Sequence, residues 1–166
     1  MLALLLLEQV GVVKSQYCAT QASPEAISAF RALPHSLSAA RGGLEIVPVQ
    51  FHVMQEASGQ LAMDLDTLAD LLAVINSYFE DAGILFEECS EARVIRDTTF
   101  WRFDASREAE LAERYDVPHT VNIYVPQLIF LDNGELVAGY ADFPPGASRV
   151  FVTGNPPSEL IAHELG

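Results

Sequence analysis

Cysteine is scarce in this sequence, and so are positively charged residues and long apolar runs. Only 2 cysteines occur among 166 residues, which is too few for a disulfide framework. Lys and Arg number 9 against 23 Asp and Glu, so a net charge of −14 repels phosphate backbones and anionic lipids, and nucleic acid is not expected as a partner. No apolar stretch approaches the roughly 20 residues that a membrane-spanning helix needs, so no membrane span is expected.

The composition is that of a folded protein, with 50% hydrophobic and 19% charged residues. A Gly-Gly pair at the end of residues 37–43 divides the chain into a lead-in segment, residues 1–43, and a patterned region, residues 44–166. The apolar run of residues 1–7 resembles a partial or atypical export signal, because no basic residue precedes it. A secreted protein is therefore expected, although a buried N-terminal strand or a misplaced start codon would give the same run.

Hydrophobic periodicity in the patterned region predicts alternating strands and helices. The most strongly patterned helix repeats its apolar residues at intervals of three and four, with Asp64 as N-cap and Gly83 just past its end. Pro48 favours an edge position or the beginning of the first strand. The expected elements are strands at 44–54, 84–89, 92–95, 120–125 and 148–153, helices at 65–79, 106–115 and from about 158, and a turn at 132–135. This order predicts an α/β fold in which one long helix packs on a sheet.

The last four residues, His163-Glu164-Leu165-Gly166, are candidates for metal chemistry on the terminal helix. In the H-E-x-x-H arrangement, histidines at i and i+4 share one helix face and bind one Zn²⁺, while the glutamate polarises the metal-bound water. The chain supplies the first histidine, the glutamate and both spacers of such a motif. By itself, a His-Glu pair also fits an ordinary solvated helix surface.

Several upstream segments resemble the pappalysin family of metzincin zinc metalloproteases, in the order in which that family places them. The matching segments are residues 17–20, in which Cys18-Ala19-Thr20 resembles a cysteine-glycine-threonine signature, residues 46–53, 81–86, 121–125, 139–144 and 150–152, and finally residues 160–166. Each segment has low specificity alone, whereas their order and spacing together make the resemblance fairly specific. The match covers most of the chain.

This resemblance implies the N-terminal part of a secreted zinc metalloendopeptidase, with His163 as the first metal ligand and Glu164 as the general base. The implied fold is a metzincin-like N-terminal subdomain, in which a mixed twisted sheet carries a long backing helix and the start of the active-site helix. Protein or peptide substrates are implied, and Ca²⁺ is a second candidate cofactor. In this class the motif continues as H-E-x-x-H-x-x-G-x-x-H. A chain that ends within the motif is expected to be inactive, because one imidazole cannot hold Zn²⁺ as three convergent ligands do.

The two cysteines have two competing interpretations. Cys18 and Cys89 form a disulfide or remain thiols in one of them, and in the other the Cys18 thiolate caps the zinc of a latent precursor. The remaining histidines, His35, His52 and His119, lack ligand spacing and are interpreted as structural or surface residues.

The last strand, residues 148–153, is expected to be a sheet edge along which an extended peptide substrate pairs its backbone. Two other functional classes stay open at this point. One is a noncatalytic secreted domain with a protease-like sheet that binds proteins or glycans. The other is an unrelated acidic α/β domain in which the H-E-L-G sequence is accidental.

Overall fold

The computed structural model describes residues 44–141, 148–156 and 158–165 of the chain. Cys18, His35, the expected lead-in segment 1–43 and residues 142–144 of the family-like segments lie outside these residues. The described part has a mixed α/β architecture, as the sequence predicts. None of its helices has the length and apolarity needed to cross a membrane.

The first strand, β1 (Glu45–Met54), runs through the middle of the larger sheet. It pairs in parallel with β2 (Ile84–Glu88), β3 (Arg93–Ile95) and β5 (Val121–Val125). The pairing with β5 begins at Val49, one residue after Pro48, which has no N–H to donate to a neighbouring strand. Pro48 therefore lies where β1 is locally an edge, which agrees with its expected position.

The strand order of the larger sheet is β2-β1-β5-β9-β8, and only the last pair is antiparallel. Its final members are β9 (Arg149–Val152) and β8 (Gly139–Ala141). The expectation that residues 148–153 form a sheet edge is wrong, because β9 is hydrogen-bonded to β5 on one side and to β8 on the other. Parallel and antiparallel strands both occur, so the expected mixed sheet is confirmed.

The long helix is α2 (Leu68–Phe79), with a 3-10 turn at each end, η1 (Leu65–Thr67) and η2 (Glu80–Ala82). The Asp64 side chain accepts the backbone N–H of Asp66, so the expected N-cap is confirmed. Gly83 ends the helical segment at φ 69°, a left-handed conformation that glycine adopts without a Cβ penalty. Both boundaries were therefore readable from the sequence.

A second, smaller sheet was not predicted. It joins β4 (Arg102–Asp104), β6 (Leu128–Phe130) and β7 (Leu136–Val137). Next to it in the chain stand the turns η3 (Thr98–Phe100) and η4 (Ala105–Arg107), and the helix α3 (Glu108–Tyr115). The expected turn at 132–135 connects β6 to β7.

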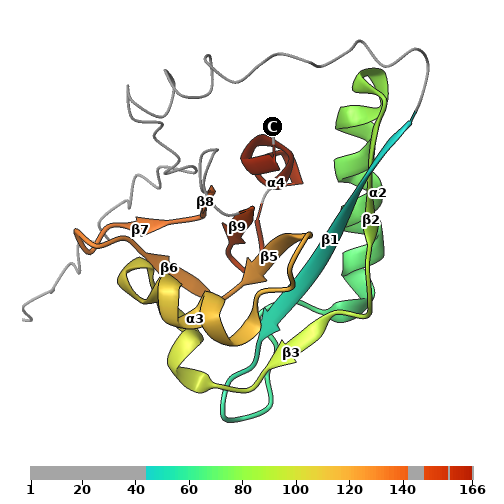
Figure 1. Cartoon of the computed structure of the whole chain (residues 1–166). Helices are drawn as coiled ribbons and strands as arrows, with labels where there is room; N and C mark the ends of the chain where they lie inside the picture. The colour runs from blue at the N-terminus through green and yellow to red at the C-terminus, as the bar shows by residue number, and fades with distance from the viewer. Residues whose placement is uncertain (1–43, 142–147, 157, 166) are drawn as a thin grey trace, which may run out of the picture.

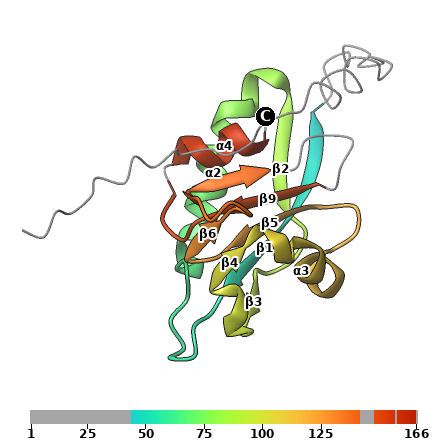
Figure 2. The ribbon, with the colours of Figure 1, turned by 90° about the vertical axis from the view of Figure 1, so that its left-hand side faces the viewer.

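The larger sheet is covered on both faces, which explains why every residue of β5 after Val121 is buried. In both views the strands β5 and β9 lie between α3 and the last helix, α4 (Ser158–Leu165) (Figure 1, Figure 2). On the α3 side, four rings from adjacent strands stack in register across the sheet: His52, Tyr124, Phe151 and Tyr140. Their centroids are 4.4, 5.1 and 4.7 Å apart, and Phe103 of β4 stacks on Phe151 at 4.8 Å.

Candidate functional site

The helix α4 carries the His-Glu pair and follows directly on the internal strand β9. Three consecutive apolar residues, Leu160, Ile161 and Ala162, are buried, so the middle of the helix is fixed by packing. It contacts α2, β8 and β9. A helix of 8 residues is too short to be stable alone in water, and its direction is therefore set by these contacts.

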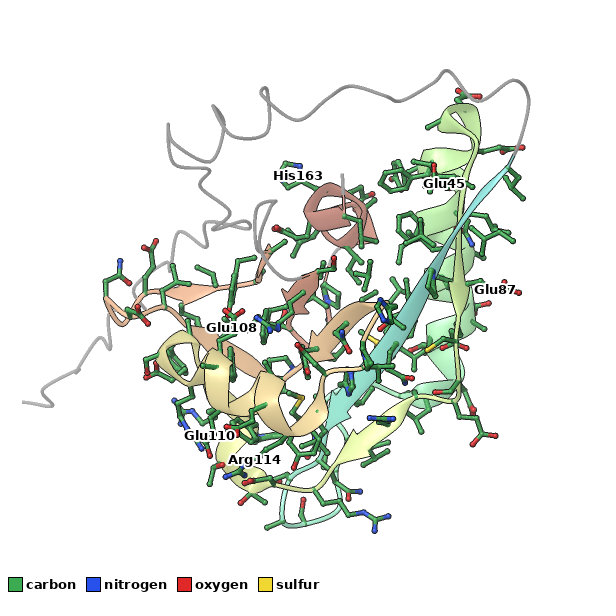
Figure 3. The ribbon with its side chains drawn as sticks, viewed as in Figure 1. Glu45, Glu87, Glu108, Glu110, Arg114 and His163 are labelled. Carbon is green, nitrogen blue, oxygen red and sulfur yellow. The ribbon has the colours of Figure 1, made fainter. Side chains whose placement is uncertain are left out.

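The two candidate residues differ in their exposure to solvent. His163 is exposed, and Figure 3 shows it projecting from α4 away from the strands. Glu164 is 8% exposed, because the next residue of a helix is turned by about 100°. The structure thus presents the imidazole to solvent and shelters the glutamate that follows it.

The metal site expected from the sequence is not complete among these residues. In residues 44–141, 148–156 and 158–165, no group of three or more His, Cys, Asp and Glu side chains converges to hold a metal ion. His163 fits the role of one ligand, since it is accessible, but Zn²⁺ requires three or four. The described residues therefore do not by themselves fit a zinc centre.

The remaining histidines in the described part lie elsewhere, in agreement with their structural or surface interpretation. His119 is exposed, at φ 64°, in the turn that precedes β5. His52 is fully buried on β1, and its Nε2 lies 2.9 Å from Oδ1 of Asn122. That oxygen also accepts the backbone N–H of Val117, so His52 carries its proton on Nε2. Burial is the main reason that the pKa of His52 falls from 6.5 to about 4.

Cys89 is exposed just after β2, where its thiol donates to Oε1 of Gln50 over 3.4 Å. Its expected partner, Cys18, lies outside the described residues. The disulfide and the latency role of Cys18 both stay predictions.

An ion-pair network that the sequence did not reveal joins α3 to the sheet. Arg149 of β9 donates from Nε to Asp116 at 2.8 Å and from a terminal guanidinium nitrogen to Glu108 at 3.1 Å. Tyr124 donates to Asp116 at 2.6 Å, and Tyr140 donates to Glu108 at 3.1 Å. Burial alone would lower the pKa of Arg149, but hydrogen bonding and charge from the two carboxylates raise it above its usual value. The sequence shows the charges but not the pairing, because Arg149 is 41 residues from Glu108.

A hollow of about 770 Å³ lies at the amino ends of β5 and β9. Its lining includes Pro48, the turn from Asp116 to Thr120, and Ser148. Neither His163 nor Glu164 lines it, so this hollow is not the site that the sequence predicts. One of its polar lining residues, Asp116, already accepts hydrogen bonds from Arg149 and Tyr124.

The chain matches no protein-family model, and no curated protein matches it.

Proposed function

We propose that this chain is the N-terminal part of a secreted zinc metalloendopeptidase of the metzincin type, resembling the pappalysins. The observation that carries the proposal is the His-Glu pair at the end of α4, a helix that packs against α2, β8 and β9 and leaves the His163 imidazole exposed. A ligand imidazole has to be accessible to the metal, and His163 meets this requirement. We assign His163 as the first zinc ligand and Glu164 as the general base.

The arrangement of elements supports this assignment. A mixed sheet, a long helix beside the site helix, and a strand that leads directly into the site helix are what the resemblance implies. In these roles α2 is the backing helix, which contacts α4, and β9 is the strand before the site. The resemblance gave residues 150–152 as an edge strand, and this part of the expectation is wrong, because the antiparallel strand β8 lies between β9 and the edge.

The chemistry of the proposal divides between the metal and the protein. When bound, zinc would polarise the carbonyl and the water that attacks it. Glu164 is the residue that would accept the proton of this water and return it to the leaving amine. No group of three metal-ligating side chains converges among the described residues, and the resemblance places the other two histidine ligands after Gly166.

The test is to express the chain together with the continuation of its reading frame and to measure bound zinc and casein cleavage. We expect stoichiometric zinc and cleavage in the native protein. His163→Ala should lose both, whereas Glu164→Gln should keep the zinc and lose the cleavage, because its amide cannot accept the proton. A continuation without further histidines, or a folded protein that takes up no zinc, would refute the proposal and favour the noncatalytic binding domain.

The 166 residues alone provide a matched comparison. With one ligand they should bind zinc weakly and cleave nothing. Robust cleavage by this shorter chain with stoichiometric zinc would contradict the assignment of the metal site.

A further inference from the structure

Gly139, the first residue of β8, lies directly beneath α4. A Cβ at this position would stand 2.9 Å from the backbone oxygen of Phe151, 3.2 Å from Cδ2 of Leu160 and 3.3 Å from Cγ1 of Val152. The first distance, to a backbone oxygen, is shorter than real Cβ contacts, so a neighbour has to move; the other two are tight contacts that a shift of a few tenths of an ångström would relieve. The backbone oxygen belongs to the paired strand β9, and the Leu160 methyl group belongs to α4. Glycine is therefore required here for space.

Gly154 makes an even closer approach in the connection between β9 and α4. A Cβ there would overlap the carbonyl group of Ala62. Ala62 is itself fixed, because its N–H donates to the backbone oxygen of Met54 at 2.9 Å, at the end of β1. The segment that leads into α4 thus rests on the segment that leads from β1 towards α2.

We propose that Gly139 and Gly154 are positioning residues for the His-Glu pair. Together they fix α4 at two points along its path, the connection before the helix and its first turn at Leu160. The helix has only 8 residues, so a displacement at its first turn is carried to His163 near its end. This inference rests on the proposed function only for the role of His163, since the packing itself does not involve zinc.

The packing suggests what an added methyl group would do. In Gly139→Ala the β8–β9 pair is held in register by backbone hydrogen bonds. The added methyl group also meets Cδ2 of Leu160 at 3.2 Å, so we expect it to displace α4 away from β8. A general loss of stability would instead loosen β1, β5 and α4 together.

The experiment compares amide hydrogen exchange and the ring resonances of His163 in the full chain and its variants. Gly139→Ala should accelerate exchange in α4 by about tenfold or more while β1 and β5 change less, and it should shift the His163 resonances. The control is Val137→Ala, which removes buried volume from the second sheet. It should affect β1, β5 and α4 alike and leave the His163 resonances in place.

A second pair of variants tests the contact itself. In a Leu160→Ala background the methyl group that opposes residue 139 is absent, so Gly139→Ala should accelerate α4 exchange by a several-fold smaller factor. An equal factor in both backgrounds, or acceleration of β1 and β5 to the same extent as α4, would overturn the role of Gly139. Gly154→Ala should not give a folded protein, and a folded variant with native α4 exchange would overturn the role of Gly154.

These measurements need no metal, so their outcome is independent of the zinc assay. If exchange behaves as expected and the extended protein binds no zinc, the packing inference stands while the function fails. If the extended protein binds zinc and Gly139→Ala leaves α4 exchange and the His163 resonances unchanged, the proposed function stands while the role of Gly139 fails.

Discussion

The buried histidine of β1 should make the stability of this protein depend on pH. His52 is fully buried, stacks on Tyr124 and donates from Nε2 to Asn122. Its Nδ1 has no hydrogen-bond partner among the described residues. Protonation places a charge on this atom in an environment that also contains the nearby positive charge of Arg93, although Asp116 partly opposes this effect. The folded state therefore disfavours the imidazolium.

The size of the effect follows from the two pKa values. Unfolding returns the pKa of His52 from about 4 to its ordinary 6.5, so the unfolded chain takes up a proton first as the pH falls. Above about pH 6.5 His52 has no effect on the free energy of unfolding, and as the pH falls from 6.5 towards 4 it lowers this free energy. The loss amounts to about 2 kcal/mol at about pH 5 and about 3 kcal/mol at about pH 4.

Urea denaturation of the native chain and of His52→Phe between about pH 8 and pH 4 measures this dependence. Phenylalanine keeps a ring for stacking on Tyr124 and cannot titrate. The variant should be less stable at neutral pH, because Asn122 loses one donor, but its free energy of unfolding should decline less steeply with acid. Carboxylates titrate in both proteins, so only the difference between them reports on His52. If the free energy of unfolding fell equally steeply with decreasing pH in both proteins, the reasoning would be refuted.

Two further substitutions test contacts that hold the elements together, each by urea denaturation. Arg149→Met leaves two partly buried carboxylates without their cation and should cost about 1–3 kcal/mol, whereas the exposed Arg96→Met should cost less than about 0.5 kcal/mol. Asn76→Leu removes the amide that pairs with both backbone groups of Phe86, at 2.9 and 2.7 Å, and should cost about 1–3 kcal/mol. Ser77 is an exposed neighbour on the same helix. A loss of stability in Asn76→Leu no larger than that in Ser77→Ala would contradict the importance of the Asn76–Phe86 pair.

Local patterns predicted the elements whose signals lie within a short stretch of chain. The repeat from Leu65 to Phe79, its Asp64 cap and the terminating Gly83 gave the long helix with both boundaries, because caps and periodicity are properties of adjacent residues. The alternation in β1 was equally clear, because its strand is 10 residues long. In β5 the alternation of apolar and polar residues did not indicate which face is buried. Asn122 and Tyr124 are buried there, as Ile123 and Val125 are.

Pairing order was not accessible in the same way. The strands of the second sheet have two or three residues each, which is too short for a period to show. The edge position expected for residues 148–153 was wrong because strand order depends on contacts between distant segments. The sequence of β9 contains no signal that β8 pairs with it. The order of the strands was therefore set by tertiary contacts that local sequence patterns do not show.

For the candidate site, too, the sequence indicated the residues but not the tertiary contacts around them. The sequence indicated His163 and Glu164 by identity, while their different exposure follows from which side of α4 meets α2, β8 and β9. The roles of Gly139 and Gly154 were also hidden, because neither has a positive φ that a turn would require. Their importance comes from the backbone and side chains that approach them.

The position of His163 depends on β9, which is constrained from every side. Strands β5 and β8 hydrogen-bond its two edges, α4 packs on one face, and Arg149 ties the other face to α3. Sites built on rigid elements hold their geometry more accurately than sites on loops. The short helix α4 packs on β9 and, at Leu160, on Gly139 of β8, so this pair of strands determines where the backbone of His163 lies.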